Sequence, residues 1–167
     1  QYSIDRQERM KQENALALVL PGYTIGSEQT AVVQGEPFTW WNAEKKEADR
    51  ILKGYAFLTS MPGYSGPVKS MVGVDESGVI QGISILEQTE TPGLGTRSTE
   101  IPSTYTIWDY FFHKERIPDV QPGPWFQEQF RGLNLNDGIT ILKLGDWNTS
   151  MKQDLIQRKA ITAITGA

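Results

Sequence analysis

The sequence contains no cysteine and a single histidine, His113, and both shortages exclude kinds of chemistry. Without cysteine the chain cannot form disulfides, use a thiolate nucleophile or hold an iron–sulfur cluster through sulfur. A zinc site or a Ser-His-Asp site would have to be built around His113 alone, with no paired ligand at a useful spacing. We therefore expect no metal site, assign no catalytic residue and interpret His113 as a surface or loop residue.

Long apolar runs and basic blocks are also missing. The longest apolar run, Ala15 to Leu20, is far shorter than the roughly 18 to 20 residues that a membrane-spanning helix requires. The formal net charge is −4 and the largest basic block is the pair Lys45-Lys46, so a nucleic-acid partner is not expected. The chain begins at Gln1 without methionine, and we expect that a natural N-terminal segment preceded it.

The composition that remains is that of a globular domain rich in turns. The chain has 167 residues, with 16 glycines, 9 prolines and 5 tryptophans. A chain of this length can bury one sizeable core without disulfide or metal cross-links. No internal repeat or low-complexity linker divides it, so we expect a single domain.

Residues 5–20 predict one helix. Asp5 is a plausible N-cap, helix-forming residues follow, and Pro21-Gly22 provides a stop signal. The first half of this segment is almost entirely polar. That pattern fits a helix on the protein surface and equally a segment that leaves a membrane.

From about residue 31 the apolar residues alternate, which predicts antiparallel strands. The clearest unit is a hairpin in which residues 68–74 and 79–86 flank the turn residues 75–78. Residues 38–43 and 54–59 predict further strands, and the charged stretch 44–50 between them is interpreted as a solvated turn or short helix. The expected fold class is α+β, an antiparallel sheet with flanking helices and an N-terminal helix.

The second half of the chain is less regular. Residues 87–124 carry five prolines and predict a long loop with a short helix around 105–114. Residues 126–130 predict a helical turn and residues 139–144 a late strand, followed by a polar segment over 145–159. Six aromatic residues of this half are interpreted as core or subunit interface: Trp108, Tyr110, Phe111, Phe112, Trp125 and Phe126.

One loop directly after the predicted hairpin is suited to contact with a flat ligand. It consists of Glu90, Thr91, Pro92, Gly93, Leu94 and Gly95. The glycines permit close approach of the backbone and the proline stiffens the turn. The spacing is not that of a dinucleotide-binding fingerprint, and no Walker lysine follows. On composition alone the run is typical of an ordinary tight loop.

Five blocks in order change that interpretation. They are residues 63–68, residues 71–75 with 78–83, Glu90 to Gly95, Trp125-Phe126 with Gln129-Phe130, and residues 164–167. Together they resemble the FMN-binding subunits RnfG and NqrC of the Rnf and Na⁺-translocating NADH:quinone reductase complexes. The resemblance covers residues 51–167, and residues 15–21 are similar to the helix that follows the family's membrane anchor.

The resemblance implies FMN as cofactor and assigns the site residues. Glu90 and Thr91 would contact the isoalloxazine ring, and Leu94 would pack on its face. Thr165, Gly166 and Ala167 would surround the phosphate end, because the family carries FMN as a phosphoester on the last threonine of a Ser/Thr-Gly-Ala-Thr run. The acceptor threonine is expected immediately after Ala167.

Two features depart from the family pattern. Many relatives carry an acidic residue three positions before the Ser/Thr of the attachment run, and this chain has Thr162 there. Residues 98–124 also form a longer connection than is usual. A contact specific to this protein is one interpretation of that insertion.

The resulting hypothesis is an electron-carrying subunit of an ion-translocating membrane oxidoreductase, without catalytic residues of its own. Residues 1–30 would follow a membrane anchor, and residues 31–167 would form the FMN-binding domain on the extracytoplasmic (periplasmic) side. Its partners would be the other membrane subunits of an Rnf-like or Na⁺-NQR-like complex and a flavin transferase. An extracytoplasmic binding domain without covalent flavin, and a cytosolic flavin reductase for which no nicotinamide motif is found, remain alternatives.

Overall fold

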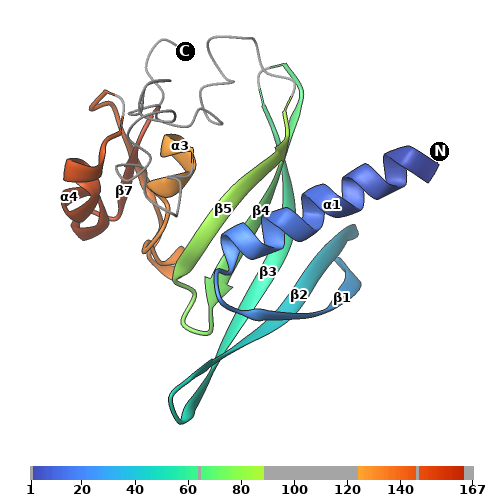
Figure 1. The fold of residues 1–167 in the computed structure, drawn as a ribbon. Coiled ribbons are helices and arrows are strands. Elements are labelled where there is room, and N and C mark those ends of the chain that lie inside the picture. The colour runs from blue at the N-terminus through green and yellow to red at the C-terminus, as the bar shows by residue number, and fades with distance from the viewer. Residues whose placement is uncertain (1, 64, 89–123, 146, 164–167) are drawn as a thin grey trace, which may run out of the picture.

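The computed structural model describes residues 2–63, 65–88, 124–145 and 147–163. Helix α1 (Tyr2–Val19) precedes a five-stranded antiparallel sheet in the order β1-β2-β3-β4-β5. The strands are β1 (Thr24–Val33), β2 (Glu36–Glu47), β3 (Arg50–Pro62), β4 (Pro67–Asp75) and β5 (Ile80–Glu87). Helix α1 lies across one face of the sheet, over β4 and β5 (Figure 1). The α+β class and the single domain predicted from the sequence are confirmed.

A second, smaller group of elements follows along the chain. It comprises α3 (Trp125–Glu128), the 3₁₀ turn Leu135–Asp137, β6 (Thr140–Leu142), the 3₁₀ turn Thr149–Met151, α4 (Lys152–Gln157) and β7 (Ala160–Thr162). Strands β6 and β7 pair in parallel. Figure 1 shows α3, α4 and β7 together beside β5, on the side of the sheet away from β1. We call residues 124–163 the C-terminal layer.

A short apolar stripe holds helix α1 on the sheet, and glycines in the strands beneath it let its backbone come close. Ala15, Leu16, Val19 and Leu20 are buried against Trp41, Ala56 and Met71 and their neighbours. A Cβ added to Gly73 would lie 2.2 Å from the carbonyl oxygen of Val19, so only glycine lets the helix backbone approach β4 this closely. The helix ends before Gly22, whose φ of 80° is left-handed.

The opposite face of the sheet carries a second core. Val72, Val74 and Ile80 are buried there with Leu133 and Ile161 of the C-terminal layer, and Ile83 packs against them. Backbone hydrogen bonds join the same parts, because Ile80 N–H donates to the Leu133 carbonyl at 2.8 Å and Gly132 N–H to the Ile80 carbonyl at 2.9 Å. The C-terminal layer is thus attached to the sheet at β5.

The predicted hairpin is confirmed as β4, a turn at Asp75–Gly78 and β5. The turn is fixed by the Asp75 carboxylate, whose Oδ1 accepts from the backbone N–H groups of Ser77 at 2.8 Å and Val79 at 3.0 Å.

The interpretation of residues 44–50 as a turn or short helix is wrong. Strands β2 and β3 run through this stretch and pair up to Glu47 with Arg50, leaving only two residues between them. The hairpin projects beyond the rest of the sheet (Figure 1), so water reaches both of its faces and charged residues suit a strand there. Cross-strand pairs such as Glu44 with Lys53 place opposite charges side by side.

Other boundaries differ in detail from the sequence predictions. Strand β1 begins at Thr24, inside the segment 1–30 that we assigned to the N-terminal helix region, and α1 ends at Val19. The turn at 126–130 is observed as α3, and the late strand at 139–144 as β6. The sequence pattern predicts neither helix α4, which lies within the polar segment 145–159, nor strand β7, which follows it. The predicted helix at 105–114 lies outside the described residues.

Candidate functional site

The residues predicted to bind the cofactor lie outside the described part of the chain, but the elements that lead to them are described. Glu90 to Gly95 begin three residues after the end of β5 at Glu87, and Thr165 to Ala167 begin three residues after the end of β7 at Thr162. Ile83 of β5 and Ile161 of β7 pack in the same apolar cluster. One core therefore positions the two strands from which both predicted cofactor-binding runs continue.

The end of β5 is fixed by an ion pair. Lys69 of β4 stands opposite Glu87 in the strand register, and its Nζ lies 2.8 Å from the Glu87 carboxylate. The hydrogen bond from Lys69, assisted by its charge, lowers the pKa of Glu87 below its ordinary value. The same contact raises the pKa of Lys69. Because both side chains are exposed, the pair orients the strand end more than it stabilises the fold.

The end of β7 is fixed by buried polar groups. The side-chain amide of Gln129 accepts from Thr162 N–H at 2.8 Å and donates to the Thr162 carbonyl at 3.2 Å. The Thr162 hydroxyl donates to the Gly145 carbonyl at 2.6 Å and accepts from Leu144 N–H at 3.3 Å. Gln129 is 1% exposed and Thr162 is 0% exposed. We call these four hydrogen bonds the Gln129–Thr162 clasp.

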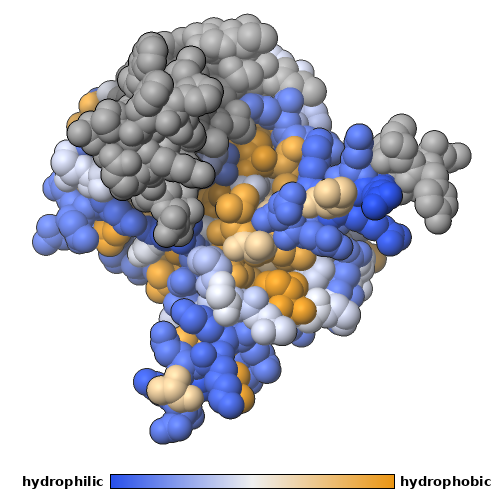
Figure 2. Space-filling view, viewed as in Figure 1, coloured by the Kyte–Doolittle hydropathy of each residue, from blue (hydrophilic) through white to orange (hydrophobic). Residues whose placement is uncertain are grey.

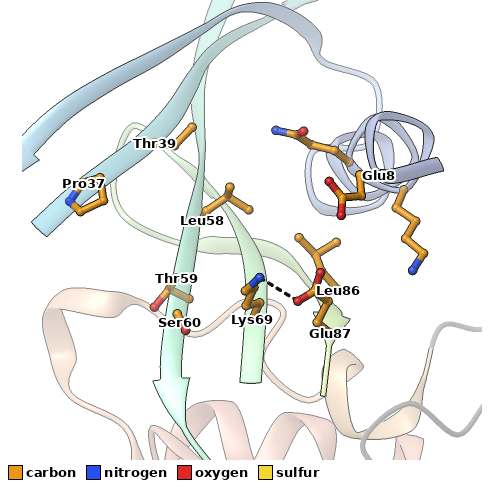
Figure 3. A pocket seen from close by; sticks show the side chains of 11 residues that line it. Glu8, Pro37, Thr39, Leu58, Thr59, Ser60, Lys69, Leu86 and Glu87 are labelled. Atoms are coloured by element: carbon orange, nitrogen blue, oxygen red, sulfur yellow. Dashed lines mark ion pairs between the residues drawn. The ribbon is translucent and has the colours of Figure 1, made fainter. Parts of the chain in front are cut away.

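A groove opens between the N-terminal half of α1 and the sheet. Its volume is about 370 Å³, within the range of small-molecule sites. Leu58 and Leu86 line it between Lys69, Glu87 and the polar side of α1 (Figure 3). Figure 2 shows apolar residues over the sheet beside the hydrophilic surface of α1. The groove thus reaches Glu87, three positions before the predicted cofactor-binding residue Glu90.

The described residues contain no cluster of three or more metal-ligating side chains of the His, Cys, Asp and Glu types. Within this same part of the chain, no helix has the length and apolar character needed to cross a membrane.

Two buried donor atoms of the C-terminal layer are of the chemical type that an oxygen-rich cofactor would bind. Arg131 Nε and Trp147 Nε1 are buried and have no hydrogen-bond partner among the described residues. Trp147 follows Gly145, which belongs to the clasp, by two residues. Both groups are donors, whereas the phosphate and ribityl chain of FMN offer acceptors.

Comparisons with known proteins identify the family of this domain. Residues 63–167 match the FMN-binding domain family. The chain belongs to this family. The match includes both predicted cofactor-binding runs, and FMN is confirmed as the cofactor of the domain.

The curated relatives carry a more specific name. The chain is 32% identical over 135 residues to the G subunit of the ion-translocating oxidoreductase complex of Pasteurella multocida, covering 70% of this chain and 65% of that protein. It is 33% identical over 110 residues to the protein of the same name from Haemophilus influenzae strain PittEE, covering 65% and 52%. A 49-residue match, 41% identical, joins it to the G subunit of the Na⁺-translocating ferredoxin:NAD⁺ oxidoreductase complex of Acetobacterium woodii, covering 29% and 24%. The chain spans about half to two thirds of the first two relatives.

The sequence alone does not predict that Gln129 has a structural role at the end of β7. In the sequence it stands only as part of an aromatic block, and Thr162 only as a departure from the family pattern. The signal that could have indicated this role is a glutamine between aromatic residues in a predicted helical turn. If the aromatic residues bury the turn, the glutamine amide must form hydrogen bonds inside the protein.

Proposed function

We propose that this chain is the electron-carrying, FMN-binding subunit of an Rnf-like ion-translocating oxidoreductase complex. The FMN is attached covalently, as a phosphoester, to a threonine immediately after Ala167. FMN supplies the electron-accepting and electron-donating chemistry, and the protein holds the cofactor and sets its surroundings. The observation that carries the proposal is the convergence of β5 and β7 on one core, each ending three residues before a predicted flavin-binding run.

The residues have distinct tasks in this proposal. Glu90 to Gly95 form a rigid loop against the isoalloxazine, with Leu94 on its face. Thr165, Gly166 and Ala167 present small side chains and backbone groups at the phosphate end, which leaves room for the transferase and for the phosphoester. The Lys69–Glu87 pair and the Gln129–Thr162 clasp orient the strands that lead into these runs.

The setting of the domain is also part of the proposal. Residues 31–167 hold the FMN, and residues 1–30, whose α1 and first part of β1 pack in the same fold, lead back to a membrane anchor that precedes Gln1. The domain faces the extracytoplasmic side, where it meets the other membrane subunits of the complex and a flavin transferase that uses FAD as the FMN donor. The names of the relatives, which describe subunits of ion-translocating complexes, support the part of this setting that places the domain in such a complex.

The experiment is expression of the natural full-length protein with and without a flavin transferase, followed by denaturing electrophoresis. The proposal expects a band that fluoresces under ultraviolet light only when the transferase is present. A dark band in both cases would instead support an extracytoplasmic binding domain of the same fold without covalent flavin. Oxidation of NADH by the isolated domain would support the flavin reductase alternative.

A further inference from the structure

Gln129 occupies the place of a missing strand beside β7. Strand β7 pairs with β6 on one side, and Ala163 N–H continues this ladder by donating to the Leu142 carbonyl at 2.9 Å. The N–H and carbonyl of Thr162 serve the other side, where the Gln129 amide binds both. A primary amide has one acceptor and two donors, so it can satisfy a single strand residue as a neighbouring strand would.

Because the Gln129–Thr162 clasp is buried, its hydrogen bonds allow only one register of β7. An amide, a hydroxyl and a strand backbone are enclosed together, and each would be left unsatisfied if the chain shifted along β7 by one residue. Since buried polar networks hold a unique arrangement when every member is bonded, the clasp fixes the direction and register of the chain at Thr162.

Chain geometry carries this constraint to the attachment run. Thr165 is three residues from Thr162, and a chain advances at most about 3.3 to 3.6 Å per residue. Thr165 therefore lies within about 11 Å of a buried anchor. Among the described residues, only Ala163 follows the clasp before the run that begins at residue 164.

We propose that Gln129 is a positioning residue for flavin attachment. This inference rests on the proposed function. In the attachment step the acceptor threonine hydroxyl attacks the flavin-side phosphorus of FAD, the phosphoanhydride bond breaks, AMP leaves, and the hydroxyl proton passes to the medium. Gln129 does not touch the reacting atoms. It holds β7 in the register that presents the acceptor to the transferase, and this placement governs the rate of attachment.

The test is a single-turnover flavinylation assay on the natural full-length protein with purified transferase and FAD. Gln129→Met keeps the length of the side chain and removes both the oxygen and the nitrogen of the amide. Val19→Ala is the control, because it opens a cavity beneath α1, away from the clasp; denaturant unfolding checks that both variants are folded in the assay. Gln129→Glu is the partial replacement, since its carboxyl keeps an oxygen that accepts from Thr162 N–H but loses the amide nitrogen that donates to the Thr162 carbonyl.

The expected result is a fall of the attachment rate by at least about tenfold in Gln129→Met, because small misplacements of reacting groups have effects of this size. Gln129→Glu should be intermediate, and Val19→Ala should stay within about twofold of wild type. If Gln129→Met does not fold, the comparison of Gln129→Glu with Val19→Ala decides. Equal rates in the Gln129 variants and the control would overturn the inference. A wild-type protein that accepts no flavin would overturn the proposed function and this inference with it.

Discussion

The two layers on the sheet are held by different forces. Helix α1 is bound mainly by apolar contact and by close approach of its backbone to the glycines of β4 and β5. The C-terminal layer combines a modest apolar cluster with the buried polar Gln129–Thr162 clasp. The difference suggests a division of labour, in which apolar burial gives the domain its stability and directional hydrogen bonds fix the strand that leads to the cofactor.

The largest effect is expected from overpacking beneath α1. In Gly73→Ala the new methyl would meet the Val19 carbonyl oxygen at 2.2 Å, so α1 must move and unfolding should become easier by about 3 kcal/mol. Gly82→Ala, whose nearest contact is the Leu18 carbonyl oxygen at 2.9 Å, should cost about 1 to 2 kcal/mol. Urea unfolding measures both. Costs below about 0.5 kcal/mol in both variants would show that α1 is not seated on these strands.

A smaller effect is expected from the clasp itself. Thr162→Val keeps the shape of the side chain but leaves the Gly145 carbonyl and Leu144 N–H without this hydroxyl, which should cost about 2 kcal/mol in the free energy of unfolding. Thr140→Val is the matched control on the neighbouring strand, where the side chain is exposed and the change should be within about 0.5 kcal/mol. Equal stability of the two variants would argue against the structural role of the clasp.

The β4–β5 turn, which is bonded to the C-terminal layer through Leu135 N–H and the Gly78 carbonyl, should be more modest in its effect. Asp75→Ala removes the acceptor of two turn N–H groups and of Gln81 Nε2, for an expected cost of about 1 kcal/mol. The neighbouring exposed Glu76→Ala serves as control. Hydrogen exchange should quicken at Ser77 and Val79 in Asp75→Ala only; unchanged exchange there would contradict this account of the turn.

The smallest effect concerns the exposed Lys69–Glu87 pair. Because the folded-state pKa of Glu87 is lowered, its contribution to stability is present above the ordinary carboxyl pKa and is lost as the pH falls through the lowered value. The pKa of Lys69 is raised, so its contribution is present below the ordinary lysine pKa and is lost as the pH rises through the raised value.

Nuclear magnetic resonance titration tests this pair. In Lys69→Met the pKa of the Glu87 carboxyl should rise toward its ordinary value, and added salt should produce part of the same rise in the wild type. A pKa of Glu87 that does not change in Lys69→Met would show that the pair does not form in solution.

Local patterns predict the β4–β5 hairpin well, because alternation and turn residues act over a few neighbours. They do not predict that residues 44–50 are strand, since a charged stretch is typical of turns unless a partner strand is known to continue beside it. They also miss β7, whose three residues form a strand through parallel pairing with distant β6. The roles of Glu90 to Gly95 and of Thr165 to Ala167 come from the family resemblance and stay predictions. The Gln129–Thr162 pairing joins residues 33 positions apart, so the sequence around neither residue could predict it.

The central claim is tested most directly by intact mass and peptide mapping of the natural full-length protein expressed with its flavin transferase. The account predicts a mass gain equal to one FMN less one water, located on the threonine that follows Thr165-Gly166-Ala167. An unmodified mass, or flavin on a different peptide, would contradict it.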